Sequence, residues 1–126
     1  MTHGLSPVDL LVCTKCLRGE AALENGIRPG AHLFHRLLAL GMPDTVRVTG
    51  VECLQNCDRG CSIALRGPGR WTYVYGNLHE NNDVDVVAEG AMRYQAAPNG
   101  LVPWRDRSDH FRKNCIARIP PMEAPL

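Results

Sequence analysis

The chain has 126 residues, of which 44% are hydrophobic, and its 14 Lys and Arg residues nearly balance 13 Asp and Glu residues, for a net charge of +1. This length is typical of one domain with its own core, and the small net charge argues against nucleic acid or an anionic membrane surface as a partner. The sequence has neither a signal-peptide pattern nor an apolar run of the ~18 residues that cross a bilayer. We therefore expect a cytoplasmic protein.

The first half of the chain predicts a strand, a helix and a second strand. The aliphatic residues 8–12 predict a buried strand that ends at Cys13, and a loop with several glycines follows it. Apolar residues then recur at helical spacing over residues 31–42. Residues 45–51 alternate as in a half-buried strand. This order is typical of two parallel strands joined by a crossover helix.

The second half predicts a hairpin and another helix. Residues 62–66 and 71–75 predict antiparallel strands, because a Gly-Pro-Gly turn joins them. We expect the alternating aromatic residues of the second strand to pack in the core or against neighbouring strands. An amphipathic helix is predicted to begin after Asn81 or Asn82 and to end before Pro98. Its predicted buried stripe consists of Val84, Val87, Ala88, Ala91 and Met92.

Together the elements predict an α/β fold with a four-stranded mixed sheet and helices packed on it. Residues 1–97 would form this domain. Residues 98–126 contain five of the nine prolines but also several large apolar side chains. That segment is too apolar for a free linker, and we predict an extended C-terminal arm that packs on the domain or on a partner.

Five of the six cysteines fall into two groups that follow the two predicted parallel strands. Cys13 and Cys16 form a C-x-x-C motif, and Cys53, Cys57 and Cys61 follow at intervals of four. In a reducing compartment, clustered cysteines indicate metal binding or thiol chemistry rather than structural disulfides. Because the carboxyl ends of neighbouring parallel strands can lie close together, we expect the two groups to converge.

The cysteine pattern suits an iron–sulfur cluster, since a [2Fe–2S] centre takes four thiolates in its all-cysteine form. The predicted cluster and metal ligands are Cys13, Cys16, Cys53 and Cys57. Lys15, Arg18 and Arg59 would offset the negative charge of the thiolates. Cys61 is either a small buried residue, the interpretation we favour, or a substitute ligand. Cys115 belongs to neither group and is not predicted to ligate.

The cysteine motifs resemble those of the thioredoxin-like [2Fe–2S] ferredoxins, a group that includes the small ferredoxin-like subunit of respiratory complex I. Their second ligand pair has the C-x-x-x-C spacing of Cys53-Leu-Gln-Asn-Cys57, and a strand and an aromatic hairpin ending in Tyr75-Gly-Asn-Leu78 follow here as well. Their first pair is wider than that of Cys13 and Cys16. The resemblance implies a thioredoxin-like fold.

Nearly the whole chain is even more similar to a bacterial family of predicted metal-binding proteins with a thioredoxin-like core, often found beside cobalamin-biosynthesis genes. Its C-x-x-C motif, its C-L-x-x-C-x-x-G-C motif and its tail have counterparts here, the last in Gly100-Leu-Val-Pro-Trp-Arg105. This resemblance implies metal binding and a link to cobalamin biosynthesis.

We therefore predict a [2Fe–2S] protein for electron transfer or a metal-handling step, with a redox or metal-handling protein as partner. It would form a homodimer and have no catalytic turnover of its own. One alternative is a zinc- or cobalt-binding protein with a structural or delivery role. Another is a thiol–disulfide oxidoreductase that uses Cys13 and Cys16. We interpret His32 and His35 as solvated side chains of the first helix rather than ligands.

Overall fold

The computed structural model describes residues 6–15, 26–55 and 60–122. Its first half contains β1 (Val8–Cys13), α1 (Pro29–Leu40) and β2 (Val46–Val51). The second half contains β3 (Ile63–Arg66), β4 (Thr72–Tyr75), α2 (Val84–Ala96), the 3-10 turn η2 (Trp104–Asp106), α3 (Asp109–Lys113) and β5 (Cys115–Ile119). The four predicted strands and the two predicted long helices are therefore present, with ends within a few residues of those expected.

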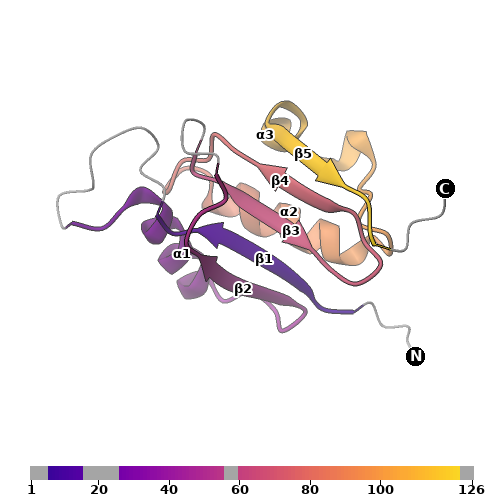
Figure 1. Ribbon diagram of the computed structural model, residues 1–126, viewed down its shortest axis with the longest axis horizontal. Coiled ribbons are helices and arrows are strands. Elements are labelled where there is room, and N and C mark those ends of the chain that lie inside the picture. The colour runs from indigo at the N-terminus through magenta and orange to yellow at the C-terminus, as the bar shows by residue number, and fades with distance from the viewer. Residues whose placement is uncertain (1–5, 16–25, 56–59, 123–126) are drawn as a thin grey trace.

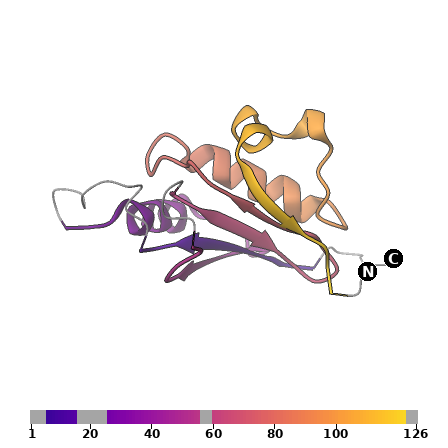
Figure 2. The same cartoon turned by 45° about the horizontal axis from the view of Figure 1, so that its top comes forward.

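The strands form one mixed sheet in the order β2-β1-β3-β4-β5 (Figure 1). β1 and β2 are parallel, whereas the β1–β3, β3–β4 and β4–β5 pairs are antiparallel. The predicted sheet had four strands, and the fifth comes from the segment predicted as an extended arm. Figure 2 shows β5 running beside β4, with α3 just before it in the chain.

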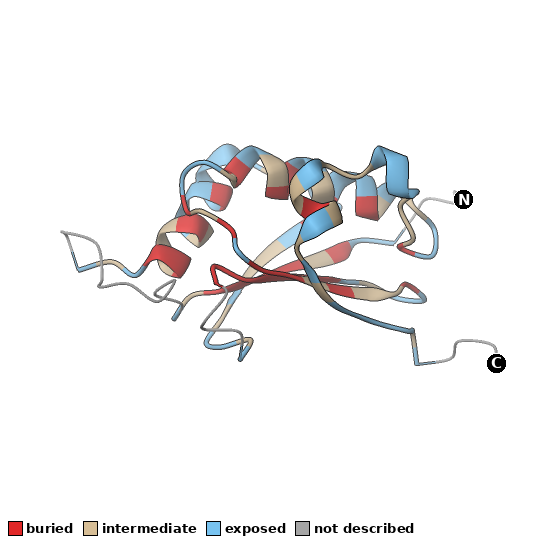
Figure 3. Ribbon diagram, turned by 90° about the horizontal axis from the view of Figure 1, so that it is seen from above, coloured by how far each residue is buried: buried red, intermediate tan, exposed pale blue. Residues whose placement is uncertain are grey.

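The helices lie on one face of the sheet, and none of the described helices covers the other face (Figure 3). Alternate residues of the strands point to the helix side, as the pleat of a strand requires. The core between the two layers includes Leu10, Val12, Ile63, Leu65, Tyr73 and Tyr75 from the sheet and Leu33, Leu37, Val87, Ala91 and Tyr94 from the helices. The predicted packing of the two hairpin tyrosines is thus confirmed.

Two details of α2 differ from the prediction. Its N-cap residue is Asp83, not Asn81 or Asn82. Met92 was expected in the buried stripe, but half of its surface is exposed, and Tyr94 is buried in the core instead. The Tyr94 hydroxyl donates a hydrogen bond to the Trp71 carbonyl, so this ring enters the core with its polar group satisfied.

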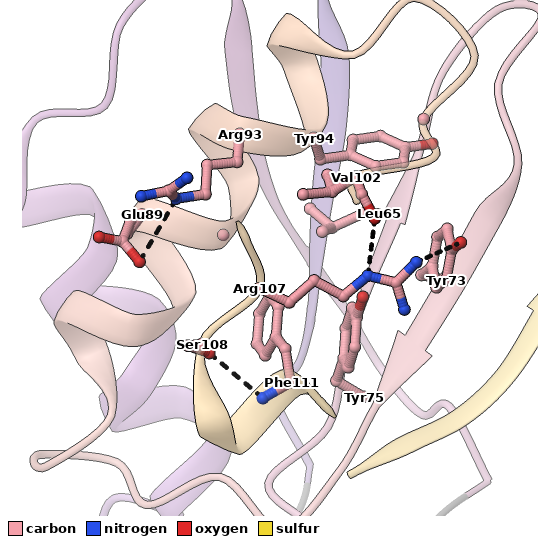
Figure 4. Close-up of a pocket in the computed structure, with 12 residues that line it drawn as sticks. Leu65, Tyr73, Tyr75, Glu89, Arg93, Tyr94, Val102, Arg107, Ser108 and Phe111 are labelled. Atoms are coloured by element: carbon pink, nitrogen blue, oxygen red, sulfur yellow. Dashed lines mark hydrogen bonds and ion pairs between the residues drawn. The ribbon is translucent and has the colours of Figure 1, made fainter. Parts of the chain in front are cut away.

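The C-terminal segment is held on the domain by an aromatic stack. The rings of Phe111 and Tyr75 are parallel, with centroids 3.9 Å apart. Ser108, the N-cap of α3, accepts a hydrogen bond from the Phe111 N–H at 3.2 Å (Figure 4). Arg107 donates to the Val102 carbonyl at 2.8 Å. The cavity within this cluster is only about 10 Å³, so it is packed core rather than a ligand site.

No helix in the described part of the chain is long and apolar enough to span a membrane.

Candidate metal centre

Three cysteines lie on neighbouring segments at one end of the sheet. Cys13 is the last residue of β1 and pairs with Val51, the last residue of the parallel β2, two positions before Cys53. Cys61 lies two positions before the antiparallel β3, and the neighbouring Ser62 carbonyl accepts a hydrogen bond from the Cys13 N–H at 3.1 Å. Cys13 and the start of the loop that carries Cys53 are therefore neighbours. The other two predicted ligands, Cys16 and Cys57, lie outside the described residues.

The Cys13 side chain approaches the loop that carries Cys53. Its Sγ lies 3.9 Å from the carbonyl oxygen of Glu52, the residue just before Cys53, and only 3% of Cys13 is exposed. Thr14 strengthens the link, because its N–H and its hydroxyl both donate to the Val51 carbonyl, at 2.8 and 3.0 Å. The segments that follow β1 and β2 are thus hydrogen-bonded to each other at the point where they leave the sheet.

Cys53 is exposed, and its sulfur accepts a backbone hydrogen bond. The donor is the Gln55 N–H, at 3.2 Å, and the Gln55 side-chain amide lies 4.0 Å from the same sulfur. Gln55 has a φ of 59°, a left-handed conformation that is uncommon for a residue other than glycine. Hydrogen bonds to sulfur are among the contacts that set the potential of iron–sulfur clusters. Cysteine spacing does not identify Gln55, because the contact of Gln55 with Cys53 depends on backbone conformation rather than side-chain chemistry.

Cys61 is fully buried in the core. It exchanges two backbone hydrogen bonds with Leu78, from the Cys61 N–H at 2.9 Å and from the Leu78 N–H at 3.1 Å. These bonds tie Cys61 to the segment just beyond β4, one residue out of the register in which Ile63 pairs with Tyr75. Its burial agrees with the favoured interpretation of a small core residue.

Cys115 is also at this end of the sheet but is separated from the others. It is the first residue of β5, the strand on the far side of β4 from β3, and it pairs with Tyr75. Its thiol lies 3.6 Å from the Ala117 carbonyl oxygen, and partial burial raises the pKa of this thiol. Strands β3 and β4 thus separate Cys115 from Cys13.

Helix α1 brings positive charge to the same end. It begins there because the chain leaves β1 at Cys13 and returns along α1 to the start of β2. The amino end of a helix carries a partial positive charge. Arg28, its N-cap residue, donates to the Lys15 carbonyl at 2.8 Å, which places the Arg28 guanidinium beside the chain that follows Cys13. Arg18 and Arg59, predicted to act in the same way, lie outside the described residues.

Within the described ranges, no three His, Cys, Asp or Glu side chains are arranged to hold a metal ion. Histidines do not complete the site. His32 contacts Asn81 Oδ1 at 2.8 Å, His35 is exposed, and His110 contacts the Asn77 carbonyl at 2.9 Å. Among the described residues, this end of the sheet thus offers the thiols of Cys13 and Cys53, one from each of the two joined segments.

Comparisons with known proteins place these observations in context. A family described as "Protein of unknown function (DUF1636)" matches residues 10–121. No curated protein matches the chain. The solved structure of a thioredoxin-like [2Fe–2S] ferredoxin from Aquifex aeolicus is similar, with a TM-score of 0.56 and 16% sequence identity, over 95% of this chain and 99% of that chain. This likeness confirms the predicted thioredoxin-like α/β fold.

Proposed function

The chain belongs to the DUF1636 family, and we propose that it is a [2Fe–2S] protein that acts in electron transfer or in a metal-handling step. The observation that carries the proposal is the approach of Cys13 to the loop of Cys53, with 3.9 Å between the Cys13 sulfur and the Glu52 carbonyl oxygen. The fold is similar to that of a thioredoxin-like [2Fe–2S] ferredoxin. A two-iron cluster needs two thiolate pairs, and the two loops carry one pair each in their sequences.

In this proposal Cys13 and Cys16 bind one iron, and Cys53 and Cys57 bind the other. The cluster would supply one-electron redox chemistry when bound. The thiolates are negatively charged, so the amino end of α1 and the Arg28 and Lys15 side chains favour binding. The Gln55 N–H would continue to donate to the Cys53 sulfur.

We extend the proposal to a redox or metal-handling protein as partner and to a role linked with cobalamin biosynthesis, on the strength of the sequence resemblance. A thiol–disulfide oxidoreductase is less well supported, because Cys13 is almost fully buried and reactive cysteines are partly exposed. Zinc or cobalt would use the same thiols, so metal analysis must separate these cases.

Metal analysis of anaerobically purified protein tests the function. We expect a brown protein with visible absorbance and about two irons and two sulfides per chain, as a [2Fe–2S] centre requires. The measurements are iron and sulfide assays together with the electron paramagnetic resonance spectrum of the reduced protein. A colourless protein that retains one tightly bound zinc or cobalt after attempted cluster reconstitution would refute the proposal in favour of the metal-binding alternative.

The conformation of Gln55 leads to a second prediction. Gln55→Val should lower the reduction potential of the cluster, because a β-branched residue resists the left-handed conformation that directs the N–H to Cys53. Without that dipole, the added negative charge of the reduced state is less stabilised. Gln55→Gly is the matched control, since glycine adopts this φ freely and retains the N–H. Redox titration of both variants checks the prediction, and equal potentials in the two would contradict it.

A further inference from the structure

The helix-free face of the sheet carries a row of charged residues at the end opposite the cysteines. Asp9 alternates with the core residues Val8 and Leu10, so its side chain points away from the helices. In the strand register, Asp9 pairs with Arg47 of β2 on one side and with Arg66 of β3 on the other. Asp9 and Cys13 are four residues apart along β1, or roughly 13 Å. This row is therefore separate from the candidate metal centre.

One carboxylate orients both guanidinium groups. Arg47 contacts Asp9 Oδ1 through Nε at 2.7 Å and through Nη2 at 2.6 Å, and Arg66 Nε donates to Asp9 Oδ2 at 3.2 Å. The Asp9 side chain is 15% exposed, whereas those of Arg47 and Arg66 are 73% and 58% exposed. Because each guanidinium has five N–H donors, both retain donors that have no partner in the described part of the chain. The pair is thus held in place with its remaining donors accessible.

These residues form one side of a groove of about 870 Å³. Its apolar walls come from separate segments: Pro7 before β1, Pro68 in the β3–β4 turn, and Ile119 with the residues that follow β5. The volume falls in the range of small-molecule sites, roughly 300–1,000 Å³. The groove therefore combines a cationic side with apolar walls, as a ligand with a charged end and an apolar body would require.

A buried arginine fixes one of these walls. Arg70, in the β3–β4 turn, is only 2% exposed. Its guanidinium donates to the Ala97 and Gln95 carbonyls at 3.2 and 3.1 Å, at the carboxyl end of α2. The turn is thereby tied to the helix layer. Arg47 and Arg66 present exposed guanidinium groups to the groove, and Asp9 is the one acidic residue among the described residues that line it, so the groove favours an anion.

We propose that this groove binds a small organic anion in which a carboxylate or phosphate group is attached to an apolar body. Arg47 and Arg66 bind the anionic group, since guanidinium matches the geometry of both oxyanions. Asp9 is a positioning residue that aligns the two arginines. Pro7, Pro68 and Ile119 contact the apolar body. This inference does not depend on the proposed cluster, because it uses none of the cysteines.

Titration of the ¹⁵N-labelled full chain with three matched probes tests the proposal by amide chemical shifts. The probes are naphthalene-2-carboxylate, 2-naphthyl phosphate and the neutral naphthalene-2-carboxamide. We expect saturable shifts around Arg47, Arg66 and Ile119 with at least one anion, and about tenfold weaker binding of the carboxamide, a difference of about 1.4 kcal/mol. The anion that binds more tightly identifies the preferred headgroup. Equal binding of the carboxamide, or no saturable shift with either anion, would overturn the proposal.

Variants then test the two arginines. Arg47→Gln and Arg66→Gln should each weaken binding of the better anion about tenfold, whereas Arg93→Gln should leave it unchanged. Arg93 is a suitable control because it is exposed on α2 and pairs with Glu89 at 3.6 Å, away from the groove. Thermal melts confirm that each variant is folded. If both groove variants bind the anion as well as the unmodified chain does, the assignment is wrong. The three-probe comparison stands even if a variant fails to fold.

Discussion

Cys13→Ser is expected to abolish assembly of a stable [2Fe–2S] cluster, reducing iron and sulfide in the purified protein to background. Serine cannot supply the thiolate that each iron requires, and Cys13 is fixed by its backbone hydrogen bond to Ser62 beside the loop of Cys53. Cys16→Ser, Cys53→Ser and Cys57→Ser should have the same effect. Iron and sulfide assays after anaerobic purification, with the visible spectrum, measure the loss.

Two other cysteines provide matched controls for this prediction. Cys115→Ser should retain the cluster, since Cys115 lies beyond β4, away from β1 and β2. Cys61→Ser should also retain iron, but with lower stability, because a hydroxyl replaces a fully buried thiol. Retention of iron in Cys57→Ser and its loss in the Cys57→Ser/Cys61→Ser double variant would show that Cys61 acts as a substitute ligand. Loss of the cluster in Cys115→Ser would contradict the assignment.

The parallel pair and the hairpin were predictable because their sequence signals are local. A continuous aliphatic run marks β1, alternation marks β2, and a Gly-Pro-Gly turn joins β3 to β4. The convergence of Cys13 and Cys53 then follows from parallel pairing alone. The meeting of these two cysteine-bearing segments at one end of the sheet could thus be predicted from residue order and spacing.

The fifth strand was not predictable in the same way. β5 is an edge strand whose residues are mostly exposed, so Cys115–Ile119 shows no alternation between apolar and polar residues. It joins the sheet because β4 has a free edge and because Phe111 anchors the segment on Tyr75. Both causes are long-range contacts, which composition and periodicity do not record. The groove beside Asp9 depends on the same strand and was missed for the same reason.

The aromatic anchor predicts large effects on stability. Phe111→Ala should lower the free energy of unfolding by about 3–5 kcal/mol, the usual cost of removing a buried phenylalanine side chain. It leaves a space beside Tyr75, whose ring lies parallel to that of Phe111, and it detaches α3 and β5 from the rest of the core. Urea denaturation followed by circular dichroism gives the loss in stability. Amide hydrogen exchange should show reduced protection of β5 in particular.

A substitution at Gly90 of α2 tests this anchor directly, because its effect on the free energy of unfolding depends on whether Phe111 is present. A Cβ at Gly90 would lie 2.1 Å from Cε2 of the Phe111 ring, so Gly90→Ala should destabilise the unmodified chain by about 1–3 kcal/mol through overpacking. In the Phe111→Ala background that clash is absent, and the same substitution should instead stabilise the protein by up to about 1 kcal/mol, the helix-propensity gain of alanine over glycine. Denaturation of the four proteins in this double-mutant cycle measures the coupling. If Gly90→Ala has the same effect in both backgrounds, the α2 backbone is not in contact with the Phe111 ring, and the anchor of the C-terminal segment must lie elsewhere.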